Sequence, residues 1–235
     1  TLGATFTKNN SKVKELWNGL DEYTYTSSRS VYYVMRVGQP VGEFRIPAPE
    51  TVKDKNSPYY GYTVVNNNGR PNTSATDYEY LGKAEADFTM GFTTNLRWKN
   101  FSFSATADWR KGGLMYSNTA YITHFNGNST QTVYNERNAF IYPNTVKIVN
   151  GEYVENNIMV KSNEMHSNYN YSNNPYVRRN IVLPKDYFKL REVSLTYDFP
   201  KNLLTKTPFK KVMVSLVGRN LLLFTPKKNN YIDPE

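Results

Sequence analysis

The sequence contains no cysteine and only two histidines, His124 and His166. Without thiols the chain can form neither disulfides nor thiolate zinc sites, and it has no cysteine nucleophile. Long apolar runs are also missing: the longest stretches, such as 221–224, fall far short of the roughly 18 residues of a membrane-spanning helix. These absences exclude disulfide scaffolds, zinc–thiolate proteins and helical membrane proteins.

What the sequence does contain is an unusual share of aromatic residues. Of 235 residues, 15% are aromatic and 20 are tyrosine, whereas only 39% are hydrophobic. A chain with this many aromatics is not disordered. Tyrosine is a strand former, and the low apolar content means that apolar residues are dispersed. The composition predicts an ordered, β-dominated protein.

The formal net charge of +9 raises the question of an anionic partner. The lysines and arginines come in ones and twos, such as 110–111, 178–179 and 210–211, and not in one cluster on a single element. Solvated basic loops are the simplest interpretation. A cationic lumen, or attraction to acidic lipid headgroups or acidic substrates, is the alternative. Nucleic acid is not an expected partner.

Alternation with a period of two residues predicts the strands. Apolar and small polar residues alternate from Met90 to Trp98 and again from Phe101 to Arg110, with Lys99-Asn100 as a tight connection. This pattern predicts a hairpin of two strands of about ten residues. Three further strands are expected, at 1–7, 187–199 and 211–224. The two faces of 211–224 are both fairly apolar, so its inward side is not assigned.

The intervening regions, 18–86 and 112–186, are rich in Gly, Pro and Asn and are expected to be loops. Short strands are predicted within the first of them, at 31–37 and 60–65. No helix of useful length shows a period of 3.6 residues, and 203–206 is expected to form a single turn.

The sequence has no phosphate-binding, dinucleotide-binding, zinc-protease or serine-hydrolase motif. The acidic pairs Asp77/Glu79 and Glu85/Asp87 have the residue type of an acid/base couple, but two residues apart in a loop they are expected to be solvated charges. We therefore expect no catalytic residue, no metal site and no cofactor.

Strands with one apolar and one small-polar face occur in two architectures: soluble sandwiches and outer-membrane barrels. Three details favour the barrel. The strands approach the 9 to 11 residues that cross a bilayer when tilted. One connection is very short while others exceed 60 residues, as in outer-membrane barrels. Aromatics stand at strand ends, where interfacial girdles lie; they are Trp98, Phe101, Trp109, Tyr197 and Phe199.

The carboxyl-terminal third carries a more specific pattern. The segments 187–197 (YFKLREVSLTY), 199–200 (FP), 218–221 (GRNL) and 233–235 (DPE) follow one another in this order. Together they resemble the closing region of the SusC/RagA family, TonB-dependent outer-membrane transporters of Bacteroidetes. The motif residues, for which we expect structural roles, are Leu190, Arg191, Glu192, Leu195, Tyr197, Pro200, Gly218, Arg219, Asn220, Leu221, Asp233, Pro234 and Glu235.

Upstream segments are similar to the family as well: 38–42 (GQPVG), 81–84 with 90–92 and 98–101, and the Gly112-Gly113 pair. The chain departs from the family at Ala86, where a proline is usual. The resemblance implies that residues 1–235 are the carboxyl-terminal part of a plugged, all-β, antiparallel transmembrane barrel of about 22 strands. Residue 1 falls in a predicted strand, and the family continues past the 233–235 motif to a last strand. We therefore expect the plug domain and the final strand to lie outside this sequence.

The resemblance also implies a function. Such transporters import oligosaccharides or oligopeptides across the outer membrane, take them from a SusD-like surface lipoprotein, and are driven by the TonB complex acting on the plug. We expect the same function, partners and location here, with outer-membrane lipid around the barrel. Candidate substrate contacts lie in the Tyr- and Asn-rich loops; they are Tyr121, Asn126, Asn128, Tyr169, Tyr171 and Tyr176. A soluble carbohydrate-binding or adhesive β-sandwich is the alternative.

Overall fold

The computed structural model describes residues 1–160, 175–229 and 231–235. The chain divides into two compact units. Unit 1 comprises Thr1–Asn10, Glu85–Gly113 and Pro184–Glu235, and unit 2 comprises Ser11–Ala84 and Leu114–Leu183. No helix in the described part of the chain is long and apolar enough to cross a membrane.

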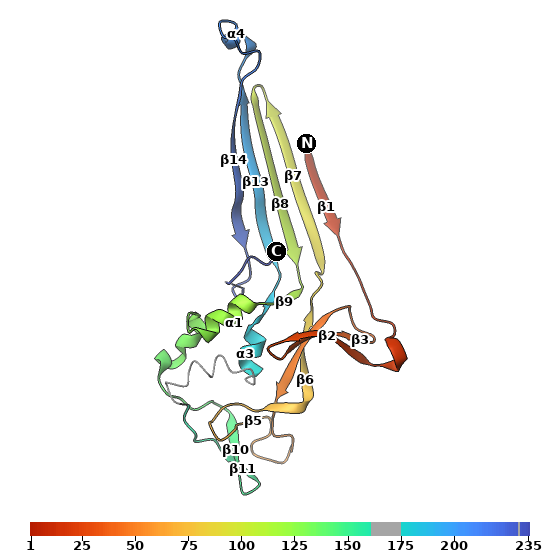
Figure 1. Ribbon diagram of the computed structural model, residues 1–235, viewed down its shortest axis with the longest axis vertical. Coiled ribbons are helices and arrows are strands. Elements are labelled where there is room, and N and C mark those ends of the chain that lie inside the picture. The colour runs from red at the N-terminus through yellow and green to blue at the C-terminus, as the bar shows by residue number, and fades with distance from the viewer. Residues whose placement is uncertain (161–174, 230) are drawn as a thin grey trace. The chain divides into compact units, whose positions relative to one another are not determined.

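Unit 1 is one layer of five antiparallel strands in the order β1-β7-β8-β13-β14 (Figure 1). The strands are β1 (Leu2–Thr7), β7 (Phe88–Trp98), β8 (Phe101–Lys111), β13 (Tyr187–Asp198) and β14 (Met213–Phe224). They are the five strands that alternation predicted, and the strands from β7 onward are 11 or 12 residues long.

The two ends of this sheet differ. At one, which we call the turn end, Lys99 and Asn100 join β7 to β8, with Lys99 at a φ of 51°. Helix α4 (Lys201–Leu204) lies in the connection from β13 to β14 at the same end, and Pro200 is its N-cap. At the opposite end, the loop end, β1 and β8 lead into the long connections. Pro200 thus ends β13 as expected, whereas the single helical turn begins two residues earlier than predicted.

Unit 2 holds most of the buried apolar side chains. Its main sheet has the order β2-β3-β4-β6, with β2 (Glu22–Ser28), β3 (Val31–Arg36), β4 (Glu43–Pro49) and β6 (Thr73–Lys83). A second sheet joins β5 (Thr63–Val64), β10 (Thr145–Val149) and β11 (Glu152–Glu155), and a third pairs β9 (Leu114–Tyr116) with β12 (Val182–Pro184). Val52, Val64 and Val146 form a buried cluster.

The helices of unit 2 are short. They are the 3-10 helices η1 (Trp17–Gly19) and η2 (Thr130–Arg137), and the α-helices α1 (Asn118–Phe125) and α3 (Pro175–Asn180). The Ser117 hydroxyl caps α1 by accepting a hydrogen bond from the Ala120 N–H. The expectation of loops in 18–86 and 112–186 was therefore wrong in part, since β2, β4, β6, β10, β11 and α1 lie there. Alternation did not predict these elements because they contain few apolar residues and because β4 contains Pro47 and Pro49.

Stacked cations and rings link the strands of the main sheet of unit 2. The Arg45 guanidinium lies 3.6 Å from the centre of the Tyr78 ring and forms a 3.0 Å ion pair with Glu22. The Arg36 guanidinium lies 3.7 Å from the Tyr80 ring centre and binds Glu43. Because each charge has a partner of opposite sign, the sheet can keep these groups half-buried.

Candidate functional site: a two-faced sheet and its charged cluster

The strand register of unit 1 places most apolar residues of β1, β7, β8 and β13 on one face, which we call the apolar face. β14 is apolar on both faces, with Leu216 on this face and Val217 on the other. Leu195 of β13, for example, lies between Phe103 of β8 and Leu216 of β14. This face is open: Leu216 is 76% exposed and Leu2 is 79% exposed. Among the described residues of unit 1, Ala107 and Pro234 are the buried apolar ones. A single layer whose apolar face is uncovered within its own unit lacks the second sheet of a sandwich.

A row of aromatic rings crosses this face at the turn end. Trp98 and Phe101 stack with their ring centres 6.5 Å apart, Phe101 and Tyr197 lie 4.8 Å apart, and Tyr197 and Phe199 lie 5.1 Å apart. These residues come from β7, β8 and the end of β13. We call them the turn-end aromatic row.

A second aromatic row crosses the loop end of the same face. Phe6 of β1 stacks on Phe88 of β7 at 5.6 Å, and Phe88 contacts Trp109 of β8 at 5.1 Å. Phe188 of β13 pairs with Trp109 in the register and lies 6.4 Å from Phe224 of β14. All five strands contribute to this loop-end aromatic row.

The spacing of the two rows fits a bilayer. Phe101 and Trp109 are eight residues apart on β8, which is about 27 Å along a strand. With the tilt of about 40° that barrel strands adopt, this corresponds to an apolar band of about 20 Å, close to the height of the outer-membrane barrel band. Aromatic girdles mark both boundaries of that band in membrane barrels.

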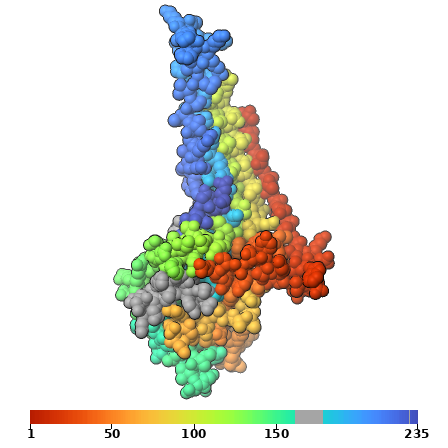
Figure 2. Space-filling view, viewed as in Figure 1, coloured from red at the N-terminus to blue at the C-terminus, as the bar shows by residue number. Residues whose placement is uncertain are grey.

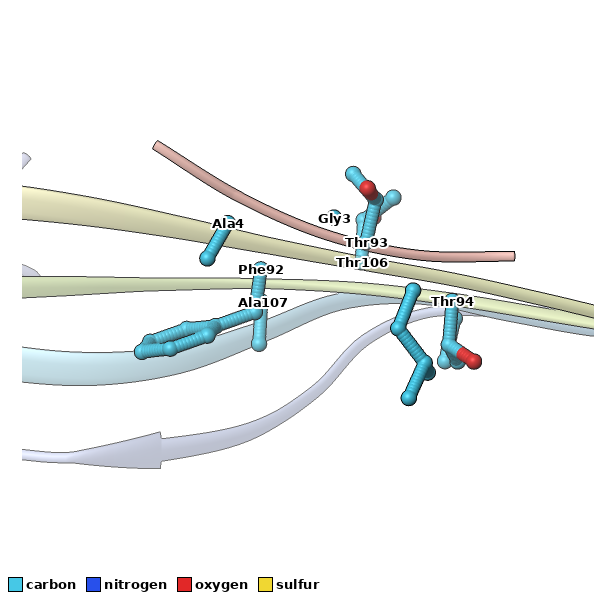
Figure 3. A pocket seen from close by; sticks show the side chains of 9 residues that line it. Gly3, Ala4, Phe92, Thr93, Thr94, Thr106 and Ala107 are labelled. Atoms are coloured by element: carbon cyan, nitrogen blue, oxygen red, sulfur yellow. The ribbon is translucent and has the colours of Figure 1, made fainter. Parts of the chain in front are cut away.

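The opposite face carries small and polar side chains. Its members are Gly91, Thr93 and Asn95 of β7, Ser102, Ser104, Thr106 and Asp108 of β8, and Ser194 and Thr196 of β13. Figure 3 shows the alternation: Thr93 and Thr106 point to one side of the sheet, and Phe92, Thr94 and Ala107 to the other. A hollow of about 500 Å³ lies over β1, β7 and β8, where the small side chains of Ala4 and Ala107 on the apolar face leave space beside Phe92.

A charged cluster lies toward the loop end of the polar face. The Lys189 ammonium donates to Asp233 Oδ2 at 2.6 Å and to Glu235 Oε2 at 2.8 Å. The Arg191 guanidinium donates through Nε to Asp108 and through Nη1 to Glu235. Two cations thus converge on one carboxylate, and the cluster ties the 233–235 segment to β13 and β8.

A β-bulge at Arg191 makes this cluster possible. Leu190 pairs with Ala107 and Glu192 pairs with Thr106, so Arg191 is an extra residue opposite β8. Before the bulge, Phe188 and Leu190 are on the apolar face; after it, the odd-numbered residues from Val193 onward take that face. The three-residue step from Leu190 to Val193 is visible in the sequence and indicates the bulge. Asp108 and Lys189, which sequence reasoning did not single out, could have been found from that signal.

The cluster also shifts the ionisation of Glu235. Hydrogen bonds from Arg191 and then Lys189 lower the pKa of Glu235 to about 2. Although its side chain is 47% exposed, this carboxylate therefore stays ionised at any physiological pH. Next to the cluster, Arg219 Nε donates to Glu192 Oε2 at 2.8 Å across the β13–β14 pair.

The remaining motif residues have packing positions. Leu190, Leu195 and Tyr197 lie on the apolar face of β13, and Pro234 is buried. A Cβ at Gly218 would come within 2.9 Å of the Leu221 side chain, so glycine allows that close approach. Asn220 has a φ of 51°, a left-handed conformation that asparagine tolerates.

The predicted substrate-contact residues are dispersed. Tyr121 is buried in α1, with the Arg29 guanidinium 4.6 Å from its ring centre. Asn126 and Asn128 are exposed in the loop after α1. Tyr176 lies in α3, and Tyr169 and Tyr171 lie outside the described residues. The structure does not bring these residues together, and their contact with substrate stays a prediction.

The acidic pairs are held by neighbouring side chains. Lys53 forms an ion pair with Asp77 and lowers the pKa of that carboxyl, and Arg179 binds Glu79. Glu85 accepts a hydrogen bond from Asn9 at 3.2 Å. Within 1–160, 175–229 and 231–235, no group of three His, Asp or Glu side chains is placed to hold a metal ion.

The sheet of unit 1 is a single antiparallel layer, with one face bounded by two aromatic rows and the other hydroxyl-lined and charged. These are the features of the wall of a membrane β-barrel. Known proteins point to the same class. No family model matches the chain. It is similar to TonB-dependent receptor P3 of Formosa agariphila, with 23% identity over 236 residues, which are 94% of this chain and 22% of the receptor.

Solved structures give the same result. The chain matches the structure of the RagAB peptide transporter with a TM-score of 0.58 and 17% identity, over 97% of this chain and 23% of the other. The open-open state of the RagAB peptide importer matches with a TM-score of 0.60 and 19% identity, over 97% and 23%. The chain therefore spans less than a quarter of the length of these proteins.

These matches confirm the resemblance to TonB-dependent transporters of the SusC/RagA type that the carboxyl-terminal motifs indicated. The relatives are described as a TonB-dependent receptor and as peptide transporters, in line with the expectation of a transport protein of the outer membrane and not an enzyme. The fold prediction is confirmed at the level of antiparallel sheets shared with such barrels.

Proposed function

We propose that residues 1–235 form the carboxyl-terminal part of a closed, plugged barrel of about 22 strands that imports nutrients across the outer membrane by a TonB-dependent mechanism. The observation that carries this proposal is the two-faced sheet of unit 1. Its apolar face is open and bounded by aromatic rows, and its polar face is lined by hydroxyls and charges. Only lipid on one side and a wet lumen on the other satisfy both faces.

The connections orient the sheet in the membrane. Outer-membrane barrels have short turns on the periplasmic side and long loops outside. The Lys99-Asn100 turn therefore faces the periplasm, and the loop end faces the exterior. In this orientation the charged cluster of Asp108, Lys189 and Arg191 with the 233–235 segment is on the lumen wall near the outer opening.

The relatives suggest two classes of cargo. RagAB is described as a peptide transporter, which supports oligopeptides, and the SusC/RagA type includes oligosaccharide importers. A SusD-like lipoprotein would deliver either cargo, and the TonB complex would act on the plug. The exposed Asn126 and Asn128 are the described candidates for contact with an arriving substrate, since amides bind both peptide groups and hydroxyls.

Uptake by whole cells tests this function. The gene for the full-length protein is deleted from its source and restored on a plasmid, and uptake of fluorescent oligopeptide and oligosaccharide libraries is measured with and without a functional TonB. We expect loss of uptake of one cargo class in the deletion strain and in the strain lacking TonB, with recovery on complementation. Equal uptake in all strains would contradict active transport.

A pull-down identifies the partner. The full-length protein, carrying a tag in the exposed Asn150-Gly151 turn, is solubilised in mild detergent and its bound proteins are identified. A surface lipoprotein of the SusD type is expected in stoichiometric amount. Recovery of the barrel alone, in a strain where uptake is normal, would contradict that part of the proposal.

A further inference from the structure

The basic charge of the chain is concentrated at the turn end of the sheet. Six cationic side chains stand there against one carboxylate, Asp198, which gives a local net charge of +5 out of +9 for the whole chain. The six are Arg97 and Lys99 of the β7–β8 hairpin, and Lys201, Lys206, Lys210 and Lys211 of the β13–β14 connection. We call them, with the connection 199–212, the basic tip.

Ion pairs within the sheet do not neutralise this positive charge. Asp198 lies 3.9 Å from both Arg97 and Lys211, so one carboxylate faces two cations at long range. Lys201, Lys206 and Lys210 are exposed. At the loop end, in contrast, Lys111, Lys189 and Arg191 all have carboxylate partners.

The connection that carries most of these cations is longer than a barrel turn requires. The β7–β8 turn needs two residues, whereas the chain takes residues 199–212 to pass from β13 to β14. Its cations are interspersed with exposed apolar side chains, Leu203 and Phe209, each 61% exposed. Figure 2 shows this segment in blue at the top of the view, uncovered by the other strands of unit 1. Basic and apolar side chains mixed on one exposed element are typical of a surface that contacts a membrane interface.

The basic tip adjoins the aromatic row that marks the membrane boundary. Phe199 belongs both to the connection and to the turn-end row, and Lys99 lies 4.9 Å from the Trp98 ring centre. Lysines beside an aromatic girdle extend their ammonium groups to the headgroup level. The cations are therefore at the depth at which phospholipid phosphates begin.

We propose that the basic tip binds anionic phospholipid headgroups of the periplasmic leaflet and anchors this side of the barrel in the membrane. The inference rests on the proposed function for the orientation of the sheet. The lysines provide the attraction to phosphate, and Leu203 and Phe209 insert among the upper acyl carbons. Lipid binding thus gives a role to the positive charge of the basic tip.

Lipid titration of the full-length transporter tests the proposal. Native mass spectrometry measures binding of phosphatidylglycerol and of phosphatidylcholine to the wild type, to the tip variant K201Q/K206Q/K210Q/K211Q, and to a control, K8Q/K12Q/K14Q/K55Q, which removes the same charge from exposed sites elsewhere. We expect the preference for phosphatidylglycerol to fall about tenfold or more in the tip variant, given that each cation near a surface contributes roughly a fivefold affinity. The control is expected to keep the wild-type preference.

Salt provides a test that needs no variant. If headgroup phosphates are the ligand, raising the ionic strength tenfold weakens the phosphatidylglycerol preference of the wild type and leaves phosphatidylcholine binding unchanged. The pair L203S/F209S is expected to weaken both lipids equally. A tip variant with wild-type lipid preference, a control that loses as much as the tip variant, or a tip that captures an acidic protein with no lipid preference would each overturn the proposal.

Failure of this inference and failure of the proposed function give different results. A transporter that imports its cargo but shows no preference for phosphatidylglycerol refutes lipid binding by the tip alone. A full-length protein that does not fractionate with the outer membrane refutes the proposed function, and the orientation on which the tip depends.

Discussion

At the scale of single residues, Arg191 joins three parts of unit 1. Its guanidinium binds Asp108 of β8 and Glu235 of the carboxyl-terminal segment, while its backbone forms the bulge of β13. A planar group with donors in several directions can serve two carboxylates at once, which a lysine ammonium does less well. The motif segments 190–192 and 233–235 are therefore joined by one interaction, between Arg191 and Glu235.

Replacing this arginine is expected to free the segment it holds. Arg191→Gln removes the ion pair with Asp108, leaves Glu235 with Lys189 alone, and should weaken attachment of 231–235 by about 1–2 kcal/mol. Because the chain has no cysteine, Ile232→Cys can carry a single spin label after any native cysteines elsewhere in the transporter are replaced. Electron paramagnetic resonance should report higher label mobility. Arg219→Gln, which breaks the neighbouring pair with Glu192, serves as the control, and equal effects of both variants would contradict the assignment.

The ionisation of Glu235 gives a pH prediction with a definite sign. Its pKa in the folded protein is about 2, below its ordinary value of 4.5, so its contribution to holding the segment is present above pH 4.5 and disappears as the pH falls through 2. The label at Ile232→Cys should therefore stay immobile at pH 5 and become mobile between pH 4 and pH 2. Release already at pH 6 would show that another group controls the segment.

At the scale of elements, the bulge in β13 keeps the two faces of the sheet separate. Without an extra residue, the apolar side chains before and after Arg191 would be on opposite faces, because side-chain direction alternates every residue. The extra residue of the bulge shifts the alternation by one position, so that Phe188 and Val193 share the apolar face. A sheet between lipid and water requires this separation along its whole length.

Two adjacent substitutions test which face meets lipid. Val193 is between the two aromatic rows on the apolar face, and Ser194 points to the polar face. Val193→Arg should lower the free energy of unfolding of the full-length barrel in liposomes by about 2–4 kcal/mol, the cost of arginine near the bilayer midplane. Ser194→Arg should cost less than about 1 kcal/mol, because the guanidinium enters a wet lumen. Urea unfolding followed by tryptophan fluorescence measures both, and the reverse order would contradict the membrane assignment.

At the scale of the whole molecule, the two units depend on different solvents. Unit 2 has buried clusters such as Val52, Val64 and Val146. Unit 1 has the exposed apolar face and, among its described residues, only Ala107 and Pro234 as buried apolar side chains. Unit 1 therefore gains little from the hydrophobic effect in water, and in the proposed barrel lipid would supply its apolar surroundings.

Expression of residues 1–235 alone distinguishes this architecture from a soluble sandwich. In aqueous buffer we expect aggregation without a cooperative thermal transition, because the apolar face and the backbone groups at the sheet edges stay uncovered. Calorimetry and light scattering measure the outcome. A dispersed monomer with a cooperative melt in water would favour the carbohydrate-binding or adhesive sandwich instead.

The sequence by itself determined the five strands of unit 1 and the two faces of four of them, because alternation is a local property with a period of two residues. The faces of β14, which are both apolar, were assigned only by its pairing with β13. The sequence also determined the class of protein through motifs close together in the chain. It also predicted β3 and β5. It missed β2, β4 and β6, since β4 contains Pro47 and Pro49 and the apolar residues of β6 are few. Local pattern is weak where the strands are short or polar.

Only the tertiary structure decided which segments meet. β1 pairs with β7 across the whole of β2 to β6, and β8 pairs with β13 across the second segment of unit 2, Leu114–Leu183. Those pairings, and the register shift at Arg191, bring Asp108, Arg191 and Glu235 together from positions up to 127 residues apart. Such contacts depend on the order and register of the strands. Side-chain alternation does not determine that order, because any two strands can pair as long as their apolar side chains share a face.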